Sequence, residues 1–168
     1  MTINQVSNIA LVGCGYWGKN LCRNFHALDA LNCVVDATVN GQAAARSIAP
    51  GAQITDSLDE VLRNDQIQGI ALATPAETHA ELAIKAMLAG KDVFVEKPMA
   101  LTLEDAEKIK QVAEETDRIL MVGHLLEYHP VVLKLHDLIS SGELGKVNYV
   151  YSNRLNFGKV RTEENALW

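Results

Sequence analysis

Three glycines near the N-terminus, Gly13, Gly15 and Gly18, have the spacing Gly-x-Gly-x-x-Gly and follow a short apolar segment. Gly13 permits a tight turn, Gly15 lets the backbone approach a diphosphate, and Gly18 lets a helix pack closely on the preceding strand. A helix that begins here directs N–H groups and the positive end of its dipole at that diphosphate. The context of strand, turn and helix predicts a dinucleotide site that includes Tyr16 and Trp17 of the same loop. The alternative is an ordinary glycine-rich turn.

An acidic residue, Asp36, ends the second apolar segment, 18 residues after Gly18. A carboxylate at this place can accept hydrogen bonds from the ribose hydroxyls of an adenosine, and it repels a 2′-phosphate. The next arginine, Arg46, comes ten positions later. We therefore predict NAD as the cofactor, with NADP less favoured. A solvated Asp in a turn is the alternative, because Asp is common in turns.

Two later apolar segments end in short proline loops, Thr74-Pro75 and Glu96-Lys97-Pro98. In an open parallel sheet, ligands bind beyond the carboxyl ends of the strands, so both loops should face the same crevice as the glycines. Lys97 could bond a substrate hydroxyl there and favour its deprotonation when hydride leaves the same carbon. From the residues alone, a surface lysine in a proline turn is an equal alternative.

Strands and helices that would hold these residues in place are predicted in alternation along the first 122 residues. Short β-rich segments and amphipathic helical stretches follow one another, the pattern of βαβ units that build a parallel sheet. The predicted fold class is therefore α/β, a Rossmann-like doubly wound parallel sheet over residues 1–122. We predict strands at residues 8–12, 31–35, 69–73, 92–95 and 119–122, and helices at 17–28, 42–48, 57–62, 77–89 and 102–115.

The pattern changes after residue 122. A helix is predicted at residues 130–139, and residues 147–154 alternate polar and apolar side chains as a strand with one solvated face does. We predict that residues 123–168 begin an incomplete α+β domain for substrate binding and oligomerisation. A lone strand leaves its backbone groups unpaired. The 168 residues are therefore expected to be part of a longer enzyme.

Composition limits the possible partners. The 15 basic and 21 acidic residues give a net charge of −6 without any basic run, so no nucleic acid partner is expected. No apolar run approaches the roughly 18 residues of a membrane span, and no signal peptide is apparent, so we predict no membrane partner and a cytoplasmic location. Cys14, Cys22 and Cys33 form no CxxC pair, which favours buried reduced thiols and no metal site.

These motifs resemble those of the Gfo/Idh/MocA oxidoreductases, through the glycine spacing, Ala73-Thr74-Pro75 followed by His79, and Glu96-Lys97-Pro98. The resemblance implies that Thr74, Pro75, His79, Glu96 and Lys97 belong to the cofactor site. It implies that Lys97 contacts both substrate and nicotinamide ribose, and that Glu96 lies beside the cofactor. The bond before the corresponding proline is often cis. From the residues alone, His79 is more simply explained by packing at a helix end.

The resemblance also implies a reaction. Residues 123–130 and 151–156 are most similar to members that oxidise nucleotide-linked sugars, so a sugar, nucleotide sugar or cyclitol is the expected substrate. Many relatives carry Asn and Arg where this chain has Leu125, Leu126 and Glu127. The resemblance places the catalytic His beyond Trp168 and implies a homo-oligomer for the full-length enzyme. Within the chain, His124 is the candidate that could face the crevice.

Two other functions are compatible with the same motifs. One is a stand-alone dinucleotide-binding or interaction module without catalytic activity, whose last strand pairs with a partner. The other is binding of a different nucleotide, such as S-adenosylmethionine, by the glycine turn. Asp36 suits either ribose, whereas Glu96-Lys97-Pro98 favours nicotinamide chemistry.

Overall fold

The computed structural model describes residues 8–153 and residue 155. Two compact units follow one another along the chain, Met1–Leu125 and Leu126–Trp168, and each is described by itself. The division into a dinucleotide-binding domain at residues 1–122 and a substrate domain at residues 123–168 stays a prediction.

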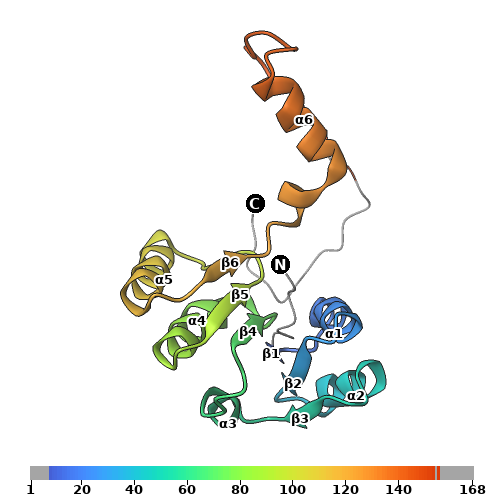
Figure 1. The fold of residues 1–168 in the computed structure, drawn as a ribbon, viewed down its shortest axis with the longest axis vertical. Helices are drawn as coiled ribbons and strands as arrows, with labels where there is room; N and C mark the ends of the chain where they lie inside the picture. Colours follow the sequence, from blue (N-terminus) through green and yellow to red (C-terminus); the bar gives the residue numbers. More distant parts are fainter. Residues whose placement is uncertain (1–7, 154, 156–168) are drawn as a thin grey trace, which may run out of the picture. The chain divides into compact units, whose positions relative to one another are not determined.

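A six-stranded parallel sheet forms the centre of the first unit (Figure 1). The strand order is β3-β2-β1-β4-β5-β6, so the direction of winding reverses between β1 and β4. Ligands of such open sheets bind outside the carboxyl ends of the strands at this reversal. The strands are β1 (Ile9–Val12), β2 (Leu31–Val35), β3 (Gln53–Thr55), β4 (Gly69–Leu72), β5 (Asp92–Val95) and β6 (Leu120–Val122).

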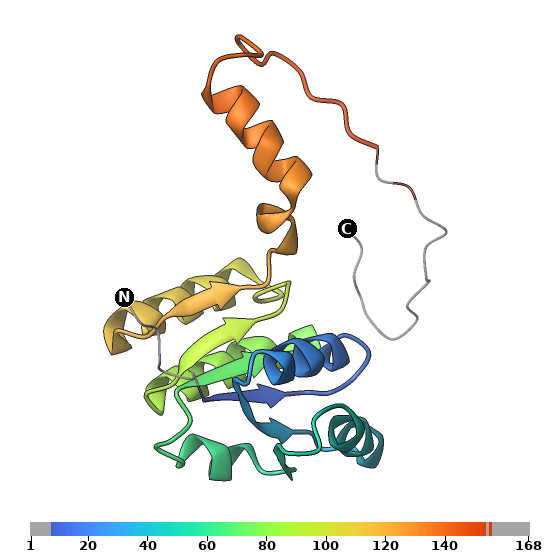
Figure 2. The same ribbon diagram turned by 45° about the vertical axis from the view of Figure 1, so that its right-hand side comes forward.

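Helices cover both faces of this sheet (Figures 1 and 2). On one face lie α1 (Gly18–Ala27) and α2 (Val39–Ile48), and on the other lie α3 (Leu58–Leu62), α4 (His79–Leu88) and α5 (Leu103–Thr116). This arrangement confirms the predicted Rossmann-like, doubly wound α/β fold. Within the described part of the chain, no helix has the length and apolar character needed to cross a bilayer.

Side chains alternate between two apolar cores along each central strand. In β1, Ala10 and Val12 join the core beneath α3, α4 and α5, whereas Leu11 joins the core beneath α1 and α2. The same alternation recurs in β4, where Ile70 and Ala71 belong to different cores. A sheet that is covered on both faces needs apolar side chains at consecutive positions. Continuous apolar segments therefore located these strands in the sequence.

The edge of the sheet beyond β2 differs from the prediction. The three-residue strand β3 was missed, because so short a segment shows no period and pairs with only one neighbour, β2. The helix α2 begins at Val39, three residues before the predicted start. Its first turn forms because the Thr38 side chain accepts a hydrogen bond from the Gly41 N–H group at 3.0 Å.

The strand predicted at residues 147–154 is wrong for residues 147–153, which have no regular secondary structure. Residue 154 lies outside the described residues. A strand is held by hydrogen bonds to a neighbour, and a single segment with no partner strand cannot form them. Alternation of polar and apolar side chains shows which face a strand would bury, but it supplies no partner.

In the second unit, the described residues contain the helix α6 (Pro130–Ser140), close to the predicted 130–139. Pro130 suits the first turn of a helix, where its missing N–H group costs nothing. The His129 side chain caps the helix by accepting a hydrogen bond from the Val131 N–H group at 3.2 Å. The short 3₁₀ helix η2 (Leu125–Tyr128) precedes it.

Candidate dinucleotide site

The glycine loop leaves β1 and enters α1 at the carboxyl edge of the sheet. Gly13 has a φ of +91°, and a Cβ on it would lie 2.8 Å from the carbonyl oxygen of Ala73. A Cβ on Gly18 would collide with the carbonyl oxygen of Gly13. Nothing lies within 4 Å of the place that a Cβ on Gly15 would take. The backbone is therefore open to a ligand at Gly15, between two glycines required by the turn and by close packing.

The N-terminus of α1 lacks a side-chain cap. Trp17 occupies the cap position without a capping hydrogen bond, and the first turn carries no acidic residue. Four other helices, α2, α3, α5 and α6, are capped by the side chains of Thr38, Ser57, Thr102 and His129. First-turn N–H groups and the positive end of the helix dipole at α1 suit the diphosphate of a dinucleotide.

Asp36 lies just past β2 and turns its carboxylate toward the glycine loop. Its Oδ2 accepts the Cys14 N–H group at 2.7 Å, and its Oδ1 accepts the N–H and hydroxyl groups of Thr38 at 2.8 and 2.7 Å. Asp36 is 9% exposed, so the alternative of a solvated turn residue is wrong. Burial raises the pKa of Asp36, but these hydrogen bonds outweigh it and hold the pKa below its ordinary value. The carboxylate is a fixed negative charge with capacity for a further hydrogen bond.

Gly41, in the first turn of α2, is a residue that the sequence reasoning missed. A Cβ at this position would collide with the carboxylate of Asp36, which packs directly against the helix. Thr38 accepts the Gly41 N–H group and donates its hydroxyl to Asp36, so it fixes both the helix and the carboxylate. The sequence carries a signal for this arrangement, since a Thr cap is followed three residues later by a glycine that is otherwise unfavourable in a helix.

His79 lies buried beneath the loops that follow β4 and β5. Its Nδ1 lies 2.7 Å from the carbonyl oxygen of Pro98, and its Nε2 lies 2.9 Å from the carbonyl oxygen of Thr74. The His79 ring is 2% exposed and contacts both loops. It is the first residue of α4, after the 3₁₀ helix η1 (Ala76–Thr78), so the structure shows the packing role at a helix end. A contact of His79 with a cofactor stays a prediction, as do those of half-buried Thr74 and exposed Pro75.

Glu96 connects three loops at the carboxyl edge of the sheet. Its Oε1 accepts the indole Nε1–H of Trp17 at 2.6 Å, and its Oε2 accepts the Lys97 N–H group at 3.3 Å. A Cβ on Gly123, which follows β6, would lie 3.0 Å from the same Oε2. Glu96 is 6% exposed. The contact between Trp17 and Glu96 joins residues 79 positions apart, and no sequence signal pairs them.

Lys97 follows Glu96 as an exposed side chain, and the Lys97–Pro98 peptide bond is cis, as the resemblance implied. Tyr16 is exposed in the glycine loop. His124 is exposed too and lies two residues past β6, where its N–H group donates to the carbonyl oxygen of Val122 at 2.7 Å. The fold thus brings predicted site residues from the ends of β1, β2, β4, β5 and β6 to one edge of the sheet.

The three cysteines show no site chemistry. All are buried free thiols, and burial raises the pKa of Cys14, that of Cys22 to about 12 and that of Cys33 to about 11. A thiol with so high a pKa is a poor nucleophile at neutral pH. Within residues 8–153 and 155, no three His, Cys, Asp or Glu side chains are grouped to hold a metal ion.

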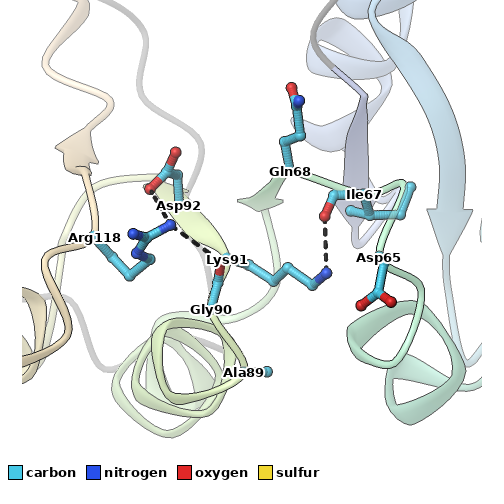
Figure 3. Close-up of a pocket in the computed structure, with 8 residues that line it drawn as sticks. All are labelled: Asp65, Ile67, Gln68, Ala89, Gly90, Lys91, Asp92 and Arg118. Carbon is cyan, nitrogen blue, oxygen red and sulfur yellow. Dashed lines mark hydrogen bonds and ion pairs between the residues drawn. The ribbon is translucent and has the colours of Figure 1, made fainter.

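A hollow of about 530 Å³ lies at the opposite, amino edge of the sheet (Figure 3). Its buried cation, Lys91, donates from Nζ to the carbonyl oxygens of Asn64 and Ile67, each at 2.8 Å. Arg118 lies 3.9 Å from an oxygen of Asp92 and also donates to a backbone carbonyl. These cations stabilise the loops that lead into β4, β5 and β6. Open parallel sheets bind their ligands at the carboxyl edge, which in this chain carries the glycine loop.

Comparison with known proteins agrees with this geometry. Residues 7–124 match the oxidoreductase family described by an NAD-binding Rossmann fold. The 2,7-anhydro-N-acetylneuraminate hydratase of Mediterraneibacter gnavus is 33% identical over 146 residues, which are 86% of this chain and 38% of the relative. The NAD(+)-dependent scyllo-inositol 2-dehydrogenase of Bacillus subtilis is 37% identical over 90 residues, 54% of this chain and 26% of the relative.

Solved structures show the same fold. GenD2 from gentamicin A biosynthesis, solved in complex with NAD, superposes with a TM-score of 0.78 at 29% identity, covering 85% of this chain and 41% of GenD2. The chain spans less than half the length of these curated relatives. With the family matched over residues 7–124, the chain belongs to the Gfo/Idh/MocA oxidoreductase family, whose NAD-binding Rossmann fold it contains.

Proposed function

We propose that this chain is the NAD-binding part of a dehydrogenase that transfers hydride between NAD and a hydroxyl group of a sugar, nucleotide sugar or cyclitol. One observation carries the proposal. The open glycine loop with its uncapped helix, the fixed carboxylate of Asp36 and the cation of Lys97 all lie at the carboxyl edge of one sheet. The scyllo-inositol dehydrogenase among the relatives supports a cyclitol or sugar substrate.

Asp36 supports NAD over NADP. Its carboxylate is held toward the glycine loop by Cys14 and Thr38, and its pKa is low, so it is ionised at neutral pH. A ribose 2′-hydroxyl can donate to this carboxylate, whereas a 2′-phosphate meets a like charge. The following α2 residues offer no arginine before Arg46, which is exposed and bonded to Gln42.

Lys97 is the residue we propose to polarise the substrate. Its ammonium can donate to the substrate oxygen and stabilise the negative charge that develops there as hydride leaves the carbon. The bound nicotinamide supplies the hydride acceptor. We propose that a His beyond Trp168 takes the hydroxyl proton, and His124 is the candidate among the described residues. A cytoplasmic, homo-oligomeric enzyme with reduced thiols is part of the same proposal.

A second reaction class has one observation in its favour, the 33% identity with a hydratase of the family. The two classes differ in redox balance. A dehydrogenase accumulates NADH in proportion to product, whereas addition of water to a substrate leaves the cofactor pool unchanged. Absorbance of NADH during turnover by the whole protein therefore separates them.

The alternative of a non-catalytic interaction module relied on an exposed last strand. The described residues 147–153 contain no strand, so the feature that favoured pairing with a partner is absent there.

Calorimetric titration of the 168-residue chain with NADH and NADPH tests the proposal. We expect NADH to bind about tenfold more tightly, from repulsion between Asp36 and the 2′-phosphate. Asp36→Asn should remove most of this difference, whereas the exposed control Asp56→Asn should retain it. A preference of the wild-type chain for NADPH, or binding of neither cofactor, would refute the proposal.

A further inference from the structure

Glu96 is a buried carboxylate without a cation beside it. It is 6% exposed, and within the described residues no Lys, Arg or His side chain forms an ion pair with it. Its two hydrogen bonds come from neutral donors, the Trp17 indole and the Lys97 backbone N–H. An isolated charge is costly to bury unless another charge or several donors compensate it. An ionised Glu96 is therefore a negative charge that the described residues compensate only in part, through these two donors.

The position of Glu96 in the fold indicates which part of a dinucleotide it would face. The crevice of a doubly wound sheet is shared by two mononucleotide-binding halves on either side of the reversal between β1 and β4. Asp36, after β2, belongs to the half that takes the adenosine. Glu96, after β5, belongs to the other half, which takes the nicotinamide nucleotide.

We infer that Glu96 is a specificity-determining residue that favours the oxidised over the reduced cofactor. The nicotinamide ring carries one positive charge in NAD⁺ and none in NADH, because the transferred hydride neutralises it. A buried negative charge attracts the first ring and is indifferent to the second. This inference rests on the proposed function, since it requires the nicotinamide half of the cofactor to bind at β4, β5 and β6.

Two features indicate that the charge of Glu96, rather than its hydrogen bonding, sets the preference for the oxidised cofactor. The Trp17 indole needs only an acceptor oxygen, and a glutamine side chain supplies one as well as a carboxylate does. The neighbouring cation, Lys97, is exposed, so water and salt screen its charge far more than that of buried Glu96. The charge of Glu96 is therefore the property that distinguishes the two redox states.

The test compares the dissociation constants of NAD⁺ and NADH, measured by calorimetry on the 168-residue chain. We expect Glu96→Gln to raise the ratio Kd(NAD⁺)/Kd(NADH) about tenfold, mainly through weaker NAD⁺ binding. The control Glu107→Gln removes the same charge from an exposed position on α5 and should leave the ratio unchanged. Equal weakening of both cofactors in Glu96→Gln would show a merely structural role and overturn the inference.

Trp17→Phe provides an independent test, because it removes the indole donor but keeps the carboxylate. The ratio Kd(NAD⁺)/Kd(NADH) should stay at the wild-type value or fall. A rise like that expected for Glu96→Gln would overturn the inference. If the wild-type chain binds neither cofactor, the proposed function fails and the inference fails with it. If the wild-type chain binds both cofactors and Glu96→Gln leaves the ratio unchanged, the inference fails but the proposed function stands.

Discussion

Replacement of Gly41 by alanine tests how the Asp36 carboxylate is held in place. An alanine Cβ would collide with that carboxylate, so the side chain of Asp36 has to move. We expect this movement to break the buried hydrogen bond that Asp36 accepts from the Cys14 N–H group. Loss of a hydrogen bond to a charged group costs about 1.5–3 kcal/mol. Alanine returns up to about 1 kcal/mol as the better helix residue.

The expected net effect of Gly41→Ala is a loss of about 0.5–2 kcal/mol in the free energy of unfolding. Urea denaturation followed by circular dichroism should show a midpoint lowered by roughly 0.25–1 M. The same variant should bind NADH more weakly and discriminate less against NADPH, because the displaced carboxylate no longer faces the glycine loop.

Gly51→Ala is the matched control. Gly51 lies in a turn with nothing within 4 Å of the added Cβ, and its φ is not in the left-handed region. This variant should keep wild-type stability and cofactor preference. If Gly41→Ala were as stable as Gly51→Ala and bound NADH equally well, the reasoning about Asp36 and Gly41 would be refuted.

Three further predictions concern single residues. Gly15→Ala should change the free energy of unfolding by no more than about 0.5 kcal/mol, because nothing lies within 4 Å of the added Cβ. The same variant should raise the Kd for NADH at least about tenfold, because the Cβ would occupy the space of the diphosphate. Unchanged NADH binding by calorimetry would contradict the diphosphate site. Lys91→Met should lower the unfolding free energy by about 2–4 kcal/mol, because the carbonyl oxygens of Asn64 and Ile67 lose their donor, while the NADH affinity of the folded protein stays constant. Because the folded-state pKa of Asp36 lies below its ordinary value of 3.8, its stabilising effect is complete above pH 3.8 and is lost as the pH falls through the folded value. Urea denaturation between pH 7 and pH 3 should therefore show the wild-type chain losing its advantage over Asp36→Asn only at the acid end; a constant difference would contradict the hydrogen-bonded carboxylate.

Local periodicity in the sequence was sufficient to identify most elements of the first unit. Four of its strands, β1, β2, β4 and β5, place side chains in both cores, and their segments are mainly apolar because both faces of the sheet are covered there. Helix α5 begins where predicted, since the Thr102 side chain caps it by accepting the Asp105 N–H group. The missed strand β3 and the absent strand at 147–153 have one cause. Strand formation depends on a neighbour, and a short segment does not contain that information.

For the candidate site, local features were enough to identify the residues at strand ends, because glycine spacing, strand-end carboxylates and proline loops can be recognised in short segments. The contacts between these residues depend on how the whole chain folds. Trp17 donates a hydrogen bond to Glu96, 79 positions away in the sequence. The carboxylate of Asp36 packs against Gly41. The ring of His79 contacts the loops that follow β4 and β5. These contacts arise when parallel strands bring distant loops to one edge, and close packing then fixes which side chains fit. The periodicity of apolar residues along a chain does not predict that packing.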